Sequence, residues 1–178
     1  MANREAIREL QARLAARLQA VQDGDNPAQW LAVHAGPAHY LLPLAQAGEI
    51  YPLAGLQAVP HTRAWFLGVL NIRGSLYGVV DLQGYYVPGP VTAWGAGDVA
   101  GAPPSVITLN PGLEMNCALA VGALAGLRGS SDFESTQPPD AAAPPGWGRR
   151  HTDAQGLVWQ EINLQALSGD SGFLNICA

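Results

Sequence analysis

The chain has 178 residues, of which 48% are apolar and 13% charged, and its net charge is −5. This composition predicts a folded domain and excludes an intrinsically disordered chain. The acidic balance, with no basic patch beyond Arg149 and Arg150, argues against nucleic-acid binding. All nine basic residues are arginine, which excludes Schiff-base chemistry and the lysine of a phosphate-binding loop.

Residues 1–22 are predicted to form an amphipathic helix. Its apolar side chains recur at helical spacing on one stripe, and arginine and glutamate cover the other faces. The stripe consists of Ile7, Leu10, Leu14, Leu18 and Val21. A helix this short is marginally stable alone, so the stripe is expected to dock on the protein's own β-domain. Docking on a partner or on a second copy is the alternative.

Three features predict a cytoplasmic protein without direct membrane insertion. The charged start of the chain does not resemble a secretory signal. The longest uncharged apolar run, residues 117–127, is too short to cross a bilayer. The two cysteines, Cys117 and Cys177, are too few for a disulfide framework and are expected to be buried thiols in a reducing compartment.

From residue 30 onward, short apolar segments alternate with Gly and Pro turns, a pattern typical of β-structure. Strands are predicted at residues 30–35, 38–44, 48–53, 65–72, 76–82, 105–109, 115–121 and 157–164. Residues 65–72 and 76–82 are nearly all apolar, so both faces of these strands are expected to be covered. Residues 84–104 and 129–150 are predicted to be loops, and residues 165–167 a helical turn. The whole pattern predicts an all-β sandwich or a pair of barrels.

Motifs that would carry catalysis or metal binding are weak. Residues 169–172 copy the Gly-Asp-Ser-Gly of serine proteases, but Phe173 replaces a further glycine, so Ser171 is interpreted as part of a surface turn. A hydrolase built on Ser171 and a histidine is the alternative from another class. The histidines have no Cys, Asp or Glu at metal-ligand spacing, although two of them lie on one predicted hairpin. They are His34, His39, His61 and His151. Cys117 lies in an apolar strand and is expected to be inert.

Charged residues interrupt the apolar strands at three places. Arg73 falls inside the apolar run 65–82, and its guanidinium must either pair with an anion or reach water. Asp81 lies at the far end of the same predicted hairpin, and Glu49 stands between apolar residues. These residues either are solvated structural charges or mark a binding surface on the hairpin.

The hairpin sequence resembles the signature of CheW-like domains. Residues 66–74, Phe-Leu-Gly-Val-Leu-Asn-Ile-Arg-Gly, and residues 79–82, Val-Val-Asp-Leu, are similar to that family's "LGVxNLRGxxxPVVDL". Residues 40–50 are similar to its "YALPIxxVxEI" stretch. Residues 153–164, together with Phe173 and Leu174, resemble the PilI branch, the adaptors of type IV pilus (twitching motility) chemosensory systems. The resemblance covers residues 28–178, which we expect to form one CheW-like domain after the helix.

This resemblance implies two packed five-stranded, SH3-like β-barrels around a shared core. It implies a non-enzymatic adaptor, without cofactor or catalytic residue, that couples a methyl-accepting chemoreceptor to a CheA-type histidine kinase. The residues at the family's partner-binding positions are Glu49, Leu70, Asn71, Arg73 and Gly74. Gly68 and Asp81 match positions that shape the hairpin.

The sequence also departs from the family pattern. Gly78 replaces the proline before Val-Val-Asp-Leu, and Gly122-Ala123 replaces a charged pair in the second subdomain. These changes concern the kinase contact. A diverged CheW-like interaction module that serves a different signalling output is therefore the alternative function.

Overall fold

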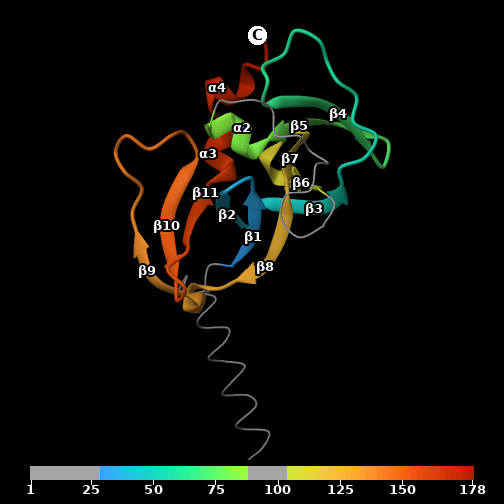
Figure 1. The fold of residues 1–178 in the computed structure, drawn as a ribbon. Helices are drawn as coiled ribbons and strands as arrows, with labels where there is room; N and C mark the ends of the chain where they lie inside the picture. Colours follow the sequence, from blue (N-terminus) through green and yellow to red (C-terminus); the bar gives the residue numbers. More distant parts are fainter. Residues whose placement is uncertain (1–28, 88–103) are drawn as a thin grey trace, which may run out of the picture.

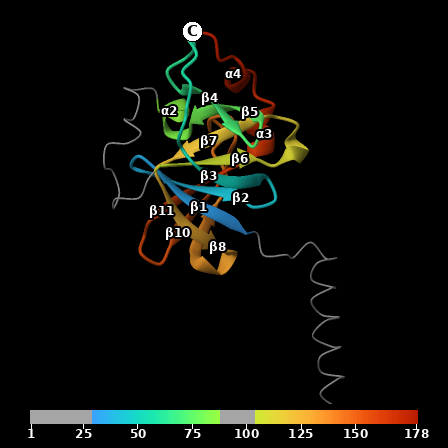
Figure 2. The ribbon, with the colours of Figure 1, turned by 90° about the vertical axis from the view of Figure 1, so that its right-hand side faces the viewer.

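The structure is a computed structural model that describes residues 29–87 and 104–178 (Figure 1). The predicted helix over residues 1–22 and most of the predicted loop 84–104 lie outside the described residues. The described part is built mainly from strands in two sheets, which lie one above the other in the two views (Figures 1 and 2). The all-β prediction with two subdomains is confirmed.

The first sheet, sheet A, has six strands in the order β8-β1-β2-β11-β10-β9. Its strands are β1 (Trp30–Ala35), β2 (Ala38–Pro43), β8 (Ala123–Arg128), β9 (Phe133–Gln137), β10 (Trp147–Asp153) and β11 (Val158–Ile162). The predicted hairpin β1–β2 turns at Gly36 and Pro37 and pairs His34 with His39. A parallel pairing of β2 with β11 joins the start of the described chain to its end.

The second sheet, sheet B, has five strands in the order β3-β6-β7-β5-β4. Its strands are β3 (Ala47–Pro52), β4 (Phe66–Ile72), β5 (Ser75–Asp81), β6 (Ser105–Leu109) and β7 (Cys117–Val121). All five lie between β2 and β8 in the sequence, so sheet B is nested inside sheet A along the chain. A parallel pairing of β5 with β7 bridges the two hairpins of this sheet.

The described part also contains short helices (Figure 1). They are α2 (Leu82–Tyr86), α3 (Leu164–Ser168) and α4 (Ser171–Leu174), and two 3-10 turns, Pro111–Leu113 and Ser130–Asp132, lie in connections. Each α-helix begins at a side chain that caps a backbone N–H, namely Asp81, Asn163 and Asp170. The predicted turn at residues 165–167 is confirmed as α3. Ser171, predicted to lie in a turn, is the first residue of α4.

The core has three parts. The largest joins both sheets and includes Val33 and Leu42 from sheet A, Ile107 and Leu119 from sheet B, and Leu164 from α3. A second cluster packs against sheet B alone, and a third, around Trp30, Leu41 and Trp159, packs inside sheet A. Both sheets therefore depend on a shared core as well as on their own, as expected for two packed subdomains.

Several predictions of detail were wrong. The predicted loop 129–150 contains strand β9 and the start of β10, and residues 123–128 form β8, so sheet A has six strands rather than five. Residues 82–86 form α2, although residue 82 was predicted to end a strand and residues 84–86 to begin a loop. β5 is covered only in its second half, because Ser75 and Leu76 are exposed and Val79 to Asp81 are buried. Cys177 is exposed, while Cys117 is buried as predicted.

Candidate functional site

The turn between β4 and β5 presents the predicted binding residues. Ile72 pairs with Ser75, which leaves Arg73 and Gly74 as the two central turn residues. Both have positive φ, +50° for Arg73 and +90° for Gly74, as a tight hairpin turn of the primed type requires. The amide of Gly74 donates to Oδ1 of Asn71 at 2.9 Å, which fixes the turn. The local sequence thus aims the Arg73 side chain outward at the hairpin tip.

Arg73 makes an ion pair across sheet B. Its Nη1 lies 3.0 Å from Oε2 of Glu49 and donates to Oε1 at 3.2 Å. Glu49 lies on β3, at the other edge of the five-stranded sheet, so this contact closes the sheet on itself. The structure therefore brings together Glu49, Asn71, Arg73 and Gly74, residues separated by up to 25 positions in the sequence.

Tyr51 completes this surface. Its hydroxyl donates to Oε2 of Glu49, and the guanidinium carbon of Arg73 lies 5.5 Å from the centre of its ring. The hydrogen bond to Glu49 raises the pKa of Tyr51, so the tyrosine remains a neutral donor. The sequence analysis missed Tyr51, although its spacing of two from Glu49 places both side chains on one face of the strand.

The ion pair is solvated. The side chains of Arg73 and Glu49 are 72% and 58% exposed, so water screens their attraction and the pair contributes little to folding. Leu76 on β5 and Ile50 on β3 are also exposed, at 60% and 45%. Because side chains alternate along a strand, Ile50 points away from the face that carries Glu49 and Tyr51. We name Glu49, Tyr51 and Arg73 the hairpin-tip surface.

The remaining predicted site residues lie away from solvent. Leu70 is 5% exposed and packs in the cluster of sheet B, so it supports the hairpin from below. Gly68 is buried in β4, and its φ of +136° is a conformation that side chains disfavour. Asp81 is buried and accepts a hydrogen bond from the amide of Gly84 through Oδ1, which begins α2.

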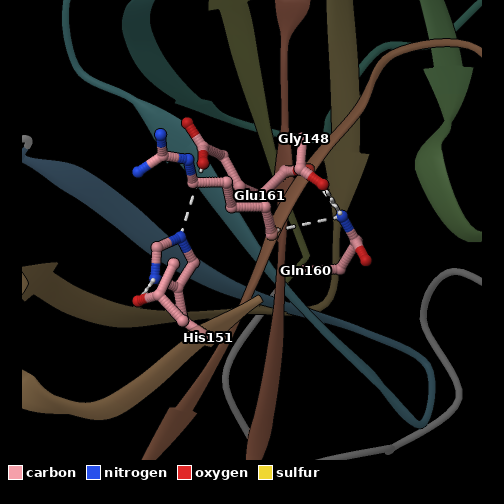
Figure 3. Close-up of polar contacts among 6 residues, drawn as sticks. Gly148, His151, Gln160 and Glu161 are labelled. Atoms are coloured by element: carbon pink, nitrogen blue, oxygen red, sulfur yellow. Dashed lines mark hydrogen bonds and ion pairs between the residues drawn. The ribbon is translucent and has the colours of Figure 1, made fainter. Parts of the chain in front are cut away.

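The histidines fill structural positions. The rings of His34 and His39 lie 4.7 Å apart, which confirms that they are neighbours, and burial together with His39 lowers the pKa of His34. His151 is buried between Thr136 Oγ1, 3.0 Å from its Nδ1, and Glu161 Oε2, 3.4 Å from its Nε2 (Figure 3). Among the described residues, no group of three or more His, Cys, Asp or Glu side chains could hold a metal ion. No helix in this part of the chain is long and apolar enough to span a membrane.

The described part of the chain thus consists of two β-sheets around a shared core, with a charged pair at the tip of the β4–β5 hairpin. Residues 29–171 match the CheW-like domain family, and the chain belongs to this family. Over 73 residues the chain is 30% identical to Protein PilI of Pseudomonas aeruginosa, a match that spans 41% of each protein.

A solved structure shows the same fold. The crystal structure of the scaffolding protein TtCheW from Thermoanaerobacter tengcongensis superposes with a TM-score of 0.61 and 17% sequence identity. The match covers 82% of this chain and 95% of that protein. The two-sheet architecture is thus retained although few of the aligned residues are identical.

Proposed function

We propose that this protein is a non-enzymatic adaptor that couples a methyl-accepting chemoreceptor to a CheA-type histidine kinase, in a type IV pilus (twitching motility) pathway. The likeness to PilI supports this choice of pathway. The observation that carries the receptor contact is the exposed Arg73–Glu49 pair, held at the hairpin tip by a tight turn beside the ring of Tyr51.

The geometry fits a helical partner. An aromatic ring beside two opposite charges of fixed position can contact the apolar face of a helix and select its orientation through charged side chains. Asn71 and Gly74 contribute indirectly, because their hydrogen bond sets the direction of Arg73. Leu70 contributes through packing below the turn.

Reversing the charge of Arg73 tests the receptor contact. We expect Arg73→Glu to weaken binding of the receptor's cytoplasmic tip about tenfold or more, because two like charges would then stand at the partner surface. The fold should survive, because an exposed ion pair contributes only about 0–1 kcal/mol. Isothermal titration calorimetry gives the affinity, and circular dichroism checks the fold.

The matched control is Arg149→Glu, which makes the same change of charge at an exposed residue of β10 in the other sheet. It should leave receptor binding unchanged. The double variant Arg73→Glu with Glu49→Arg restores the pair in reverse and should recover part of the affinity if the pair's geometry matters. Unaltered binding by a folded Arg73→Glu protein would remove the hairpin tip from the receptor contact.

The kinase contact is tested separately by titrating the protein against the regulatory domain of a CheA-type kinase from the same source. We expect micromolar binding, roughly −8 kcal/mol. Gly122 lies in the connection between β7 and β8, where its amide donates to the carbonyl oxygen of His34. If a folded protein binds the receptor but not the kinase, the replacement of the charged pair by Gly122-Ala123 has changed the output, and the diverged-module alternative holds.

A further inference from the structure

A hollow of about 660 Å³ lies under the connection between β9 and β10, on sheet A and away from the hairpin tip. Its roof is the segment 137–144, rich in proline and alanine, which arches away from the sheet beside β9 and β10 (Figure 1). Its floor includes Trp147, Gly148 and Arg150 of β10 and Gln160 of β11. The volume lies in the range of sites that hold small ligands or short peptide segments.

The arch is held by specific contacts. The amide of Ala143 donates to the carbonyl oxygen of Asp140 at 3.0 Å. The amide of Trp147 donates to the carbonyl oxygen of Pro144 at 3.1 Å. The Tyr86 hydroxyl of α2 donates to the carbonyl oxygen of Pro145 at 3.0 Å. These bonds, with four prolines in the connection, give the hollow a preformed shape, so a ligand would not bear the cost of ordering it.

Gln160 supplies a fixed acceptor in the floor. The residue is 8% exposed, and its Nε2 donates to the carbonyl oxygens of Gly148 and Glu161 at 3.0 and 2.9 Å. These bonds turn its Oε1 away from Gly148, as Figure 3 shows. No group within the described residues donates to this oxygen, so it is available to accept a peptide N–H.

Trp147 supplies a large apolar wall and an unsatisfied donor. Its indole Nε1 is buried and has no acceptor among the described residues. Buried donors without a partner are rare in native proteins, because the N–H has lost its hydrogen bond to water. A carbonyl group brought into the hollow, with a small rotation of the indole, would satisfy this donor.

One cation and one carboxylate line the hollow. Neither Arg149 nor Arg150 takes part in an ion pair within residues 29–87 and 104–178, whereas Arg73 is paired with Glu49. Arg150 and Asp140 line the hollow and Arg149 does not. Oδ1 of Asp140 accepts a hydrogen bond from the amide of Ala142 at 3.4 Å within the arch, whereas the guanidinium of Arg150 is left to bind the carboxylate of an occupant.

We propose that the hollow under the β9–β10 arch binds a short acidic peptide segment of a partner protein. A carboxylate of the segment pairs with Arg150, its backbone N–H donates to Gln160 Oε1, and an adjacent apolar side chain packs against Trp147 and the prolines of the arch. This interaction is independent of the hairpin-tip surface on the other sheet.

The test is an NMR titration of the full-length ¹⁵N-labelled protein with the tetrapeptide acetyl-Ala-Leu-Glu-Ala-amide. Five indole N–H signals are expected from five tryptophans, and Trp147→Phe identifies the one in the hollow. We expect saturable movement of the Trp147 signal with a dissociation constant of roughly 1 mM or tighter. Arg150→Gln should weaken the binding about tenfold, as loss of a charge-assisted hydrogen bond does.

Two controls test whether binding depends on Arg150 and on the carboxylate of the peptide. Arg149→Gln removes the neighbouring cation that does not line the hollow and should bind as the unmodified protein does. The peptide with Gln in place of Glu should bind at least about tenfold more weakly. The proposal is overturned if the Trp147 signal does not move, if both arginine variants lose equal affinity, or if the two peptides bind alike. Isovalerate binding as tightly as the peptide would make the hollow a small-carboxylate site and also overturn it.

Discussion

At the scale of single residues, Gly68 shows how closely the hairpin is fitted to its surroundings. Its φ is +136°, and a Cβ atom there would lie 2.1 Å from the carbonyl oxygen of Gln57. That oxygen accepts a hydrogen bond from the amide of Val69, which attaches the connection before β4 to the strand. Glycine at this position therefore has a steric reason, beyond its place in the family signature.

We expect Gly68→Ala to lower the free energy of unfolding by about 3 kcal/mol, because backbone strain and a backbone clash add. The control is Gly55→Ala, which also has positive φ, +77°, but no atom within 4 Å of the added carbon. It should cost about 1 kcal/mol. Urea unfolding of both variants measures the difference, and equal costs would show that the clash with Gln57 relaxes freely.

Gly78 explains one departure from the family signature. A Cβ at this position would lie 3.0 Å from the ring of Phe66, so a side chain larger than glycine would press against that ring. The amide of Gly78 also donates to the carbonyl oxygen of Asn116, a bond that proline cannot make. Glycine at position 78 therefore fits both the ring of Phe66 and the hydrogen bond to Asn116 in this chain.

At the scale of elements, the end of the chain acts as a clamp. Oδ2 of Asp170 accepts hydrogen bonds from the amide of Phe173 at 2.9 Å, which starts α4, and from the hydroxyl of Tyr85 on α2 at 3.0 Å. Phe173 stacks on Trp65, just before β4. Beyond α4, the backbone of Arg63 bonds to that of Ile176. The last nine residues thus connect α2 with the segment that leads into the hairpin.

We expect Asp170→Ala to lower the free energy of unfolding by about 2 kcal/mol, since it removes both the helix cap and the acceptor for Tyr85. Tyr85→Phe removes only the second bond and should cost about 1 kcal/mol. Thermal and urea unfolding measure both. If the two variants lose equal stability, the cap contributes nothing and the clamp depends on Tyr85 alone.

Strands β8 and β9 show where a sequence pattern is insufficient. Both lie at edges of sheet A, so their residues are mostly exposed and lack the apolar alternation that identified the inner strands. The sequence Phe-Glu-Ser-Thr-Gln of β9 becomes a strand through its pairing with β10. The start of α2 could have been predicted from the sequence, because Asp81 is a residue type that favours the N-cap. Its Oδ1 accepts a hydrogen bond from the amide of Gly84, three residues later.

The binding surface was predictable only in part. Arg73 and Glu49 stood out as charges in apolar segments, and the turn residues Asn71 and Gly74 came from the family signature. Their contact across the sheet depends on how β3 and the β4–β5 hairpin meet in space, which spacing along the chain does not encode. The hollow under the arch was not predicted, because residues 129–150 were predicted to form a loop and its floor depends on the pairing of β10 with β11.

At the scale of the whole molecule, acid should destabilise sheet A. Burial by itself raises the pKa of Glu161, but hydrogen bonds from His151 and Trp30 outweigh it and leave the pKa below its ordinary value of 4.5. The hydrogen bond from the Trp159 indole holds the pKa of Asp153 below its ordinary value of 3.8. A carboxyl whose pKa is lowered by folding stabilises the fold above its unfolded pKa. That contribution is lost as the pH falls through the folded pKa.

We therefore expect stability to be maintained above pH 4.5 and to decline as the pH falls below about 4. Glu161→Gln should be less stable than the unmodified protein at pH 6, and the difference should shrink toward pH 2. Urea unfolding across this range measures it. Glu134→Gln, an exposed carboxylate on β9, is the control and should show no such trend. A difference that stays constant with pH would mean that Glu161 acts through packing and not through its charge.

The nesting of one sheet inside the other has a consequence for synthesis on the ribosome. The β1–β2 hairpin emerges first, but its partners β8 and β11 emerge only after every strand of sheet B. At typical translation rates the interval between Pro43 and Ala123 lasts on the order of ten seconds. Sheet B can pair completely in that time, while Leu31, Val33 and Leu42 wait without their final neighbours. During this interval the nascent chain thus exposes the apolar side chains of the β1–β2 hairpin although sheet B is already paired. We expect chaperones to bind the hairpin in this interval.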